Sequence, residues 1–260
     1  MPCGPLSSSK HLPMADLVLF CDGLPLSGAP ALRYSHNHMP GIFCTSEVTK
    51  GLDGSPEAVA LRLRELLPGR RIFCLKQMHS DRFVRAEEVS PGVFPEADGI
   101  ITHNPLDVLC IRTADCVPVL LWADDAPVVA AVHAGWRGLS KRIVEKAVLL
   151  MHASGAGHIH MSMGPSIGPC CYAVGPEVIE ALDTRPDRQA DGRLYVDLHR
   201  IAMLQAQNAG IPPDRILQVH SCTCCNRDSF FSYRREGDLT GRNISLIGGD
   251  PCSLPGLQAR

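Results

Sequence analysis

Three residues that can bind a metal or act as nucleophiles stand at the ends of separate apolar segments. His79 follows "RIFCLK", Cys116 ends "DVLCIRTADC", and His133 lies in "AVHAGW". Two imidazoles and one thiolate form a competent zinc set that leaves a fourth coordination position open for water or substrate. Zinc bound in this way lowers the pKa of its water towards neutrality and so generates a hydroxide nucleophile.

The same three residues allow a second chemistry. A cysteine with a histidine partner can act as a covalent nucleophile, because the imidazolium stabilises the thiolate. The pattern alone also leaves open an incidental trio with no shared function. These alternatives differ in whether the three side chains must meet in the folded chain.

The elements around these residues predict a sheet that presents them at its rim. Four apolar segments predict buried strands, namely "RIFCLK", "DVLCIRTADC", "VPVLLWA" and "PVVAAVHA". A helix is predicted over residues 55–67, because Ser55 can cap it, Pro56 suits its first turn, and its apolar residues share one face. A second helix is predicted in the segment "GLSKRIVEKAVLLMHASGAG" (residues 138–157), where Gly155 ends it.

The later part of the chain continues this mixed pattern. Helices are predicted at "GPEVIEAL" and "VDLHRIAMLQAQNAG", and strands at "RILQVH" and "NISLIG". Strands and helices alternate unevenly, with an expected hairpin in the middle of the chain. The sequence therefore predicts a mixed α/β domain without all-parallel winding. No glycine-rich fingerprint follows a strand, so neither a dinucleotide fold nor a P-loop is expected.

Two basic segments are candidates for binding an anion. Arg137, Lys141 and Arg142 stand at the start of the helix after His133, where a bound phosphate would offset their conflict with the helix dipole. A solvated basic turn is the alternative. Arg234 and Arg235 in "FFSYRREGDLTGR" form either a second anion site or a surface hairpin.

Cysteines are frequent, with 12 in the chain. In a reducing cytosol most cysteines are small buried hydrophobic residues. The segment "HSCTCCNRD" looks like a metal knuckle, but adjacent cysteines cannot easily face one ion and no second C-x-x-C pair accompanies it. We therefore interpret Cys222, Cys224 and Cys225 as structural, and His199 as an isolated surface residue.

The composition is that of an ordinary globular protein. Of 260 residues, 45% are hydrophobic and 20% charged, with a net charge of −2 and only 5% aromatics. This balance argues against general nucleic-acid binding. No segment has the charged start and apolar length of a secretory signal, and none is long enough to span a bilayer. We expect a cytoplasmic protein with a flexible N-terminus over residues 1–14.

Six segments together resemble the YfiH family, whose members are named polyphenol oxidase, "laccase-domain" protein or purine nucleoside phosphorylase. The segments are "KQMHSD", "EADGIIT", "IRTADCVPVLLWAD", "AAVHAGWRGLSKRIVEKAV", "MGPSIGPCCYAVGPEV" and "FFSYRREGDLTGR". The resemblance runs from about Leu75 to Gly248 in the family's order, and "TADC" and "HAGWRG" are specific to that family.

The resemblance implies a single α/β (α+β) domain over residues 15–260. Its fold would be a layered α/β/β/α sandwich similar to the catalytic domain of cytotoxic necrotizing factor. The resemblance also implies that His79, Cys116 and His133 bind one zinc ion, with copper as the alternative metal. It implies phosphorolysis of adenosine, inosine and methylthioadenosine, and deamination of adenosine. Copper-dependent oxidation of phenols, and an amidase that edits amino acids on peptidoglycan precursors, are the alternative activities.

The leading prediction is therefore a zinc-dependent purine nucleoside enzyme in which the trio both holds the metal and acts in catalysis. Candidates for binding substrate or phosphate are Arg64, Arg137, Arg234 and Arg235, and Asp115 is a candidate for orienting an imidazole or carrying a proton. The expected partners are a purine nucleoside and phosphate, without nucleic acid or membrane, in a monomer or weak homo-oligomer. A non-enzymatic binding or scaffold protein that keeps the zinc structurally is the remaining alternative.

The first third of the chain departs from the family's pattern. The Gly-Gly-Val-Ser and S-L-N-L-G segments are not visible in "RYSHNHMPGIFCTSEVTKG". Arg62-Leu63-Arg64 stands where members commonly have Asn-Arg-Arg, and Ala173 replaces the usual glutamate of "CCYEVG". These changes predict an intact metal site with an altered wall for substrate.

Overall fold

The computed structural model describes residues 31–32, 41–44, 51, 53–90 and 92–248. The predicted flexible segment 1–14 and most of the atypical segment 33–51 lie outside these residues. Among the described residues, no helix combines the length and apolar character needed to cross a membrane.

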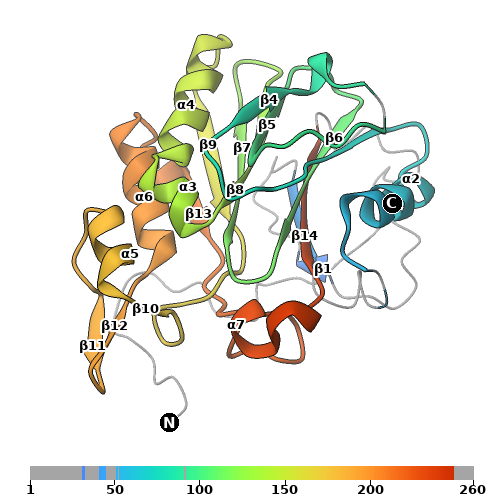
Figure 1. Cartoon of the computed structure of the whole chain (residues 1–260). Helices are drawn as coiled ribbons and strands as arrows, with labels where there is room; N and C mark the ends of the chain where they lie inside the picture. Colours follow the sequence, from blue (N-terminus) through green and yellow to red (C-terminus); the bar gives the residue numbers. More distant parts are fainter. Residues whose placement is uncertain (1–30, 33–40, 45–50, 52, 91, 249–260) are drawn as a thin grey trace, which may run out of the picture.

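Two large sheets stack face to face in the middle of the molecule (Figure 1). One sheet has the order β13-β9-β7-β8-β5-β4, and the other has the order β1-β2-β14-β6-β3. The first contains β4 (Phe83–Arg85), β5 (Gly99–Thr102), β7 (Val117–Ala123), β8 (Val129–Ala134), β9 (Ile159–Met163) and β13 (Ile216–Gln218). The second contains β1 (Ala31–Leu32), β2 (Gly41–Cys44), β3 (Arg71–Cys74), β6 (Asp107–Thr113) and β14 (Asn243–Gly248).

Helices cover the outer face of each sheet. On the six-stranded sheet lie α3 (Trp136–Ser140), α4 (Ile143–Ala153), α5 (Pro176–Ala181) and α6 (Leu198–Asn208), whereas α2 (Pro56–Leu66) packs on the five-stranded sheet. Alternate residues of one strand therefore enter different cores. In β7, Val119 and Leu121 face the helices, while Leu120 and Trp122 face the other sheet. The chain is thus a mixed α/β domain with α/β/β/α layering, as predicted.

Burial on both faces explains the continuous apolar runs in the sequence. Strands that are covered on both faces have no solvent side on which to place polar residues.

Both sheets are mixed, since β3–β6, β4–β5 and β9–β13 pair in parallel and the other ladders are antiparallel. The expectation of a fold without all-parallel winding is confirmed.

Most predicted elements are present with nearly the predicted bounds. The Ser55 side chain caps α2 by accepting a hydrogen bond from the Ala58 amide at 3.1 Å. The predicted helix over 138–157 is wrong in one respect, because it is two helices with a break between Ser140 and Ile143. Arg142 adopts a left-handed conformation with φ of 61°, which an α-helix cannot continue through.

A smaller three-stranded sheet and a short helix lie in the C-terminal half of the described chain. β10 (Ala173–Val174), β11 (Arg188–Ala190) and β12 (Arg193–Tyr195) form an antiparallel sheet of order β10-β12-β11. The helix α7 (Tyr233–Glu236) precedes β14.

The interpretation of His199 as a surface residue is wrong. His199 is buried in α6, where its Nε2 lies 2.8 Å from the Gly164 carbonyl oxygen and its Nδ1 accepts a hydrogen bond from Gln218 at 2.7 Å.

Candidate functional site

The fold brings His79, Cys116 and His133 together. His79 lies in the loop between β3 and β4, Cys116 in the turn between β6 and β7, and His133 within β8. One nitrogen of each imidazole and the Cys116 Sγ all lie within 4.8 Å of one another. The two imidazole rings meet edge to face, with centroids 4.9 Å apart and an interplanar angle of 75°. Residues up to 54 positions apart in the sequence thus form one cluster, in which His133 is buried and His79 is exposed.

Asp98 anchors both histidines of this cluster. It is fully buried just before β5, and its Oδ1 lies 2.8 Å from the Nδ1 of His133. The same carboxylate accepts hydrogen bonds from the backbone amides of Met78, His79 and Ser80, and from the Ser80 hydroxyl. Because Nδ1 of His133 is held by a carboxylate, its Nε2 is the nitrogen available to a metal.

Backbone conformation at the cluster is unusual in two places. His79 has φ of 57°, a left-handed conformation that non-glycine residues rarely adopt. The three consecutive amides bound by Asp98 stabilise that turn and aim the imidazole towards Cys116. Asp115, immediately before Cys116, has φ of 97°. Strained backbone of this kind is frequently found at functional sites.

Gly135 leaves room for the cluster. A β-carbon at this position would lie 2.9 Å from the Cys116 Sγ and 3.2 Å from the His79 Cδ2. The first of these distances is too short for a real contact. A side chain at position 135 would therefore displace the Cys116 and His79 side chains, and glycine avoids this contact.

The pKa values of three groups in the cluster are shifted from their ordinary values. Burial opposes the thiolate, but the imidazoles of His133 and His79 outweigh it and lower the pKa of Cys116 to about 6. Burial also opposes the imidazolium of His133, yet Cys116 and Asp98 raise the pKa of His133 to about 9. For Asp98, burial is outweighed by the hydrogen bonds from His133 and Ser80, which lower its pKa to about 2. Without metal, the cluster therefore holds a thiolate next to an imidazolium near neutral pH.

The predicted residue Asp115 lies beside the cluster but contacts neither imidazole in its hydrogen bonds. Its Oδ1 accepts from the Thr223 hydroxyl at 2.7 Å, and its Oδ2 accepts from the Arg234 amide at 2.7 Å. Asp98, rather than Asp115, is the carboxylate that lies at hydrogen-bond distance from an imidazole of the cluster, and a proton-carrying role for Asp115 stays a prediction. Asp115 instead ties the turn that carries Cys116 to a distant loop.

The predicted arginines occupy different surroundings. Arg137 places its guanidinium 4.5 Å from the ring centroid of Trp136, directly after Gly135. Arg234 donates to the carbonyls of Cys171 and Ala173, and Arg235 donates to those of Thr223, Cys224 and Phe230. Both side chains are thus engaged in holding loops.

Arg64 does not join the cluster. It lines a pocket with Arg70, Arg71, Ile72, Phe73 and Gly92, at the start of β3, whereas His79 follows the opposite end of that strand. Lys141 and Arg142 pair with the carboxylates of Asp81 and Glu145, as the solvated basic turn predicts.

Tyr172 is a neighbour of the cluster that the sequence did not reveal. Burial raises the pKa of its phenol, and the negative charges of Cys116 and Asp115 raise it further, while Arg234 and Arg137 oppose them. The guanidinium of Arg234 lies 5.3 Å from the Tyr172 ring centroid. Tyr172 therefore lies close enough to Cys116, Arg137 and Arg234 for their charges to act on its phenol.

Sequence reasoning missed two further groups. Asp98 has a weak signal, a single acidic residue directly before the apolar strand "GIIT". The second group is a set of four cysteines, Cys170, Cys171, Cys222 and Cys225, whose sulfur atoms also lie within 4.8 Å of one another. Its signal is the pair of segments "GPCC" and "CTCC", which lie about 50 residues apart in the sequence.

The chain is similar in sequence to a known family and to named relatives. The family model described as "Multi-copper polyphenol oxidoreductase laccase" matches residues 42–250. Purine nucleoside phosphorylase YlmD of Geobacillus stearothermophilus is 34% identical over 209 residues, covering 72% of this chain and 76% of that protein. Adenosine deaminase RL5, from an unknown prokaryotic organism, is 37% identical over 194 residues, covering 70% and 74%.

Solved structures show the same fold. The crystal structure of YlmD from Geobacillus stearothermophilus superposes with a TM-score of 0.75 at 28% identity, covering 88% of this chain and 99% of that one. The crystal structure of YfiH from Bacillus licheniformis gives a TM-score of 0.72 at 25% identity, covering 87% and 94%. Sequence match, fold and relatives agree that this chain belongs to the YfiH family, whose model carries the laccase description.

Proposed function

We propose that His79, Cys116 and His133 hold one zinc ion at the active site of a purine nucleoside enzyme. The observation that carries the proposal is the convergence of two imidazoles and one thiol from three separate elements, with one imidazole fixed by a buried carboxylate. Catalytic zinc sites commonly have three protein ligands and one open position. The relatives named purine nucleoside phosphorylase and adenosine deaminase support this class of substrate.

The donor set fits zinc in both chemistry and spacing. Zinc–nitrogen and zinc–sulfur bonds of about 2.0 to 2.3 Å in a tetrahedron place ligand atoms about 3.4 to 3.6 Å apart. The ligand atoms here lie within 4.8 Å of one another, so small side-chain rotations close the remaining gap. Zinc, when bound, supplies a Lewis acid at the open side of the cluster.

The chain's own residues would orient and polarise the substrate. Asp98 keeps the His133 ring in one orientation, and the exposed side of His79 leaves an approach for a nucleoside. Arg137 stands two residues after Gly135, in the first turn of α3, and the planar donors of its guanidinium suit phosphate. The Tyr172 phenol, kept neutral by its raised pKa, is able to donate a hydrogen bond to a ring nitrogen or ribose oxygen.

Two reactions balance at such a site. In phosphorolysis, a phosphate oxygen bonds to C1′ of the ribose, the bond from C1′ to the purine nitrogen breaks, and the base leaves with a proton. The products of adenosine are then adenine and ribose 1-phosphate. In deamination, water adds to C6 of adenosine and ammonia leaves, giving inosine. Only the first reaction requires phosphate.

A product analysis tests the proposal. Protein of known metal content is incubated with adenosine, with and without phosphate, and the products are identified by mass. We expect adenine with ribose 1-phosphate only when phosphate is present, inosine in either case, and neither product from Cys116→Ala or His133→Ala. Cys224→Ser is the matched control, because this cysteine belongs to neither cluster, and it should retain wild-type turnover.

The outcome that overturns the proposal is specific. Wild-type protein that contains zinc but leaves adenosine and inosine unchanged would refute a purine nucleoside enzyme. Phenol oxidation that depends on several tightly bound copper ions would favour the reaction for which the family model is named. Multicopper chemistry uses several histidines, and among the described residues the two candidate metal groups contain only His79 and His133.

A further inference from the structure

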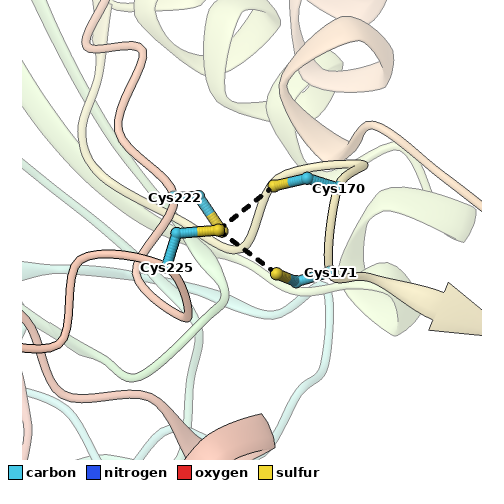
Figure 2. A group of neighbouring side chains, drawn as sticks. All are labelled: Cys170, Cys171, Cys222 and Cys225. Atoms are coloured by element: carbon cyan, nitrogen blue, oxygen red, sulfur yellow. Dashed lines mark hydrogen bonds between the residues drawn. The ribbon is translucent and has the colours of Figure 1, made fainter. Parts of the chain in front are cut away.

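A second group of metal-ligand side chains lies outside the proposed active site. Cys170 and Cys171 come from the loop between β9 and β10, and Cys222 and Cys225 come from the loop after β13 (Figure 2). In Figure 2 the sulfur atoms of both pairs point towards one another across the two loops. All four sulfur atoms lie within 4.8 Å of one another.

The spacing of the sulfur atoms suits a shared metal ion. Cys225 Sγ lies 3.6 Å from Cys170 Sγ and 3.4 Å from Cys171 Sγ. Four zinc–sulfur bonds of about 2.3 Å in a tetrahedron place the sulfur atoms about 3.8 Å apart. A disulfide bond requires about 2.05 Å, which is much shorter than either distance.

The backbone around the cluster also suits a charged metal–thiolate centre. The Gly168 amide donates to the Cys222 Sγ at 3.3 Å. Three guanidinium groups donate to carbonyls of the cysteine loops: Arg188 to Cys170, Arg234 to Cys171 and Arg235 to Cys224. A divalent ion with four thiolates carries two net negative charges, which these cations would offset.

Gly168 further limits what can occupy this place. A β-carbon there would lie 3.3 Å from the Cys170 Sγ and 3.4 Å from the Cys222 Cβ. The two loops therefore approach closely because this residue has no side chain. Neighbouring cysteines at 170 and 171 both reach the centre, since the chain turns between Gly168 and Tyr172 through backbone hydrogen bonds from the amides of Cys171 and Tyr172 to the Gly168 carbonyl.

We propose that Cys170, Cys171, Cys222 and Cys225 bind a second zinc ion as a tetrathiolate structural site. Binding releases the thiol protons and leaves no open coordination position, so this ion stabilises the fold without reacting with substrate. Four thiolates favour zinc over hard cations such as magnesium or calcium.

The site joins two loops that hold the proposed active site. Thr223 lies between two of the ligands, and its hydroxyl donates to Asp115, next to Cys116. The Arg234 amide donates to the other oxygen of the same carboxylate, while its side chain donates to Cys171. The second zinc thus fixes the position of the Cys116 turn through Thr223 and Arg234. The ligand assignment goes beyond the proposed function and does not depend on it.

Metal counting by mass spectrometry tests the assignment. Protein is purified under reducing conditions with zinc and freed of loosely bound metal. With both sites filled, wild type contains about two zinc ions per chain, and Cys225→Ser and Cys170→Ser each contain about one. Cys224→Ser is the matched control, since it lies in the same loop outside the cluster, and it should equal wild type.

X-ray absorption at the zinc edge provides the second measurement, which does not require altering the cysteine cluster. In Cys116→Ala the remaining zinc should show sulfur neighbours only, at about 2.3 Å. Loss of zinc from Cys116→Ala with unchanged zinc in Cys225→Ser would overturn the second site while leaving the first intact. A disulfide among the four cysteines under reducing conditions, or nitrogen neighbours in Cys116→Ala, would also overturn it. Loss of adenosine turnover alone would bear only on the proposed function.

Discussion

Replacing Asp98 with asparagine should weaken metal binding at the proposed site, because this carboxylate holds both the His133 ring and the turn that carries His79. The carboxylate accepts five hydrogen bonds: two at Oδ1, from the His79 amide and the His133 ring, and three at Oδ2, from Met78 and Ser80. Asparagine has one acceptor and one donor in their place. In either orientation of the amide, at least one backbone N–H of the turn over residues 78–80 loses its acceptor.

The magnitude follows from these contacts. Hydrogen bonds to a charged group contribute about 1.5 to 3 kcal/mol each. The same contacts lower the Asp98 pKa from 3.8 to about 2, which corresponds to about 2 kcal/mol of preference for the ionised carboxylate in the fold. We therefore expect Asp98→Asn to destabilise the metal-free protein by about 2 to 4 kcal/mol. Its zinc affinity should fall by about 10- to 100-fold, because the His133 ring is no longer held in one tautomer.

Urea unfolding of the metal-free protein and competition titration against a chelating indicator measure the two effects. Because the folded pKa of Asp98 is depressed, its contribution is present above pH 3.8 and is lost as pH falls towards 2. The stability difference between wild type and variant should therefore shrink over that interval. Asp125→Asn is the control, because Asp125 is a carboxylate that binds the Gly157 and His158 amides in an exposed loop. Unchanged zinc affinity in Asp98→Asn, with stability equal to that of the control, would refute the anchoring role.

Three other changes test the neighbourhood of the cluster. Gly135→Ala should reduce zinc affinity at least 10-fold in the same titration, since its β-carbon would meet the Cys116 Sγ at 2.9 Å; wild-type affinity would show that the turn adapts. In metal-free protein, alkylation of Cys116 followed by peptide mass should rise with pH through about 6, because its lowered pKa makes it a thiolate above that value; a midpoint near 9 would contradict this. Thr223→Val should lower the free energy of unfolding by about 1 to 3 kcal/mol, because it leaves the buried Asp115 Oδ1 without its hydroxyl donor; urea midpoints within error of wild type would contradict it.

Local sequence determined the elements and the candidate ligands. The apolar runs of β6, β7 and β8 are long because both faces of each strand are buried, so their strand character was visible without knowledge of the fold. The α2 helix was equally predictable from the sequence, since Ser55 and Pro56 fix its start by local hydrogen bonding and a preset φ. The break at Arg142 could not be predicted from the sequence, because arginine does not favour the left-handed backbone conformation that it adopts here.

Tertiary structure decided which residues share a site. The residue types of His79, Cys116 and His133 suggested a metal, but the pairing of β7 with β8 and the stacking of two sheets bring them together. Asp98 became the anchor because it is buried beneath that convergence, which no local pattern records. Neither "GPCC" nor "CTCC" alone contains all four cysteines of the second cluster. Their sulfur atoms meet because β9 and β13 pair, which brings together two loops about 50 residues apart in the sequence. Sequence specifies local conformation and available chemistry, whereas the meeting of distant side chains depends on the packing of the whole domain.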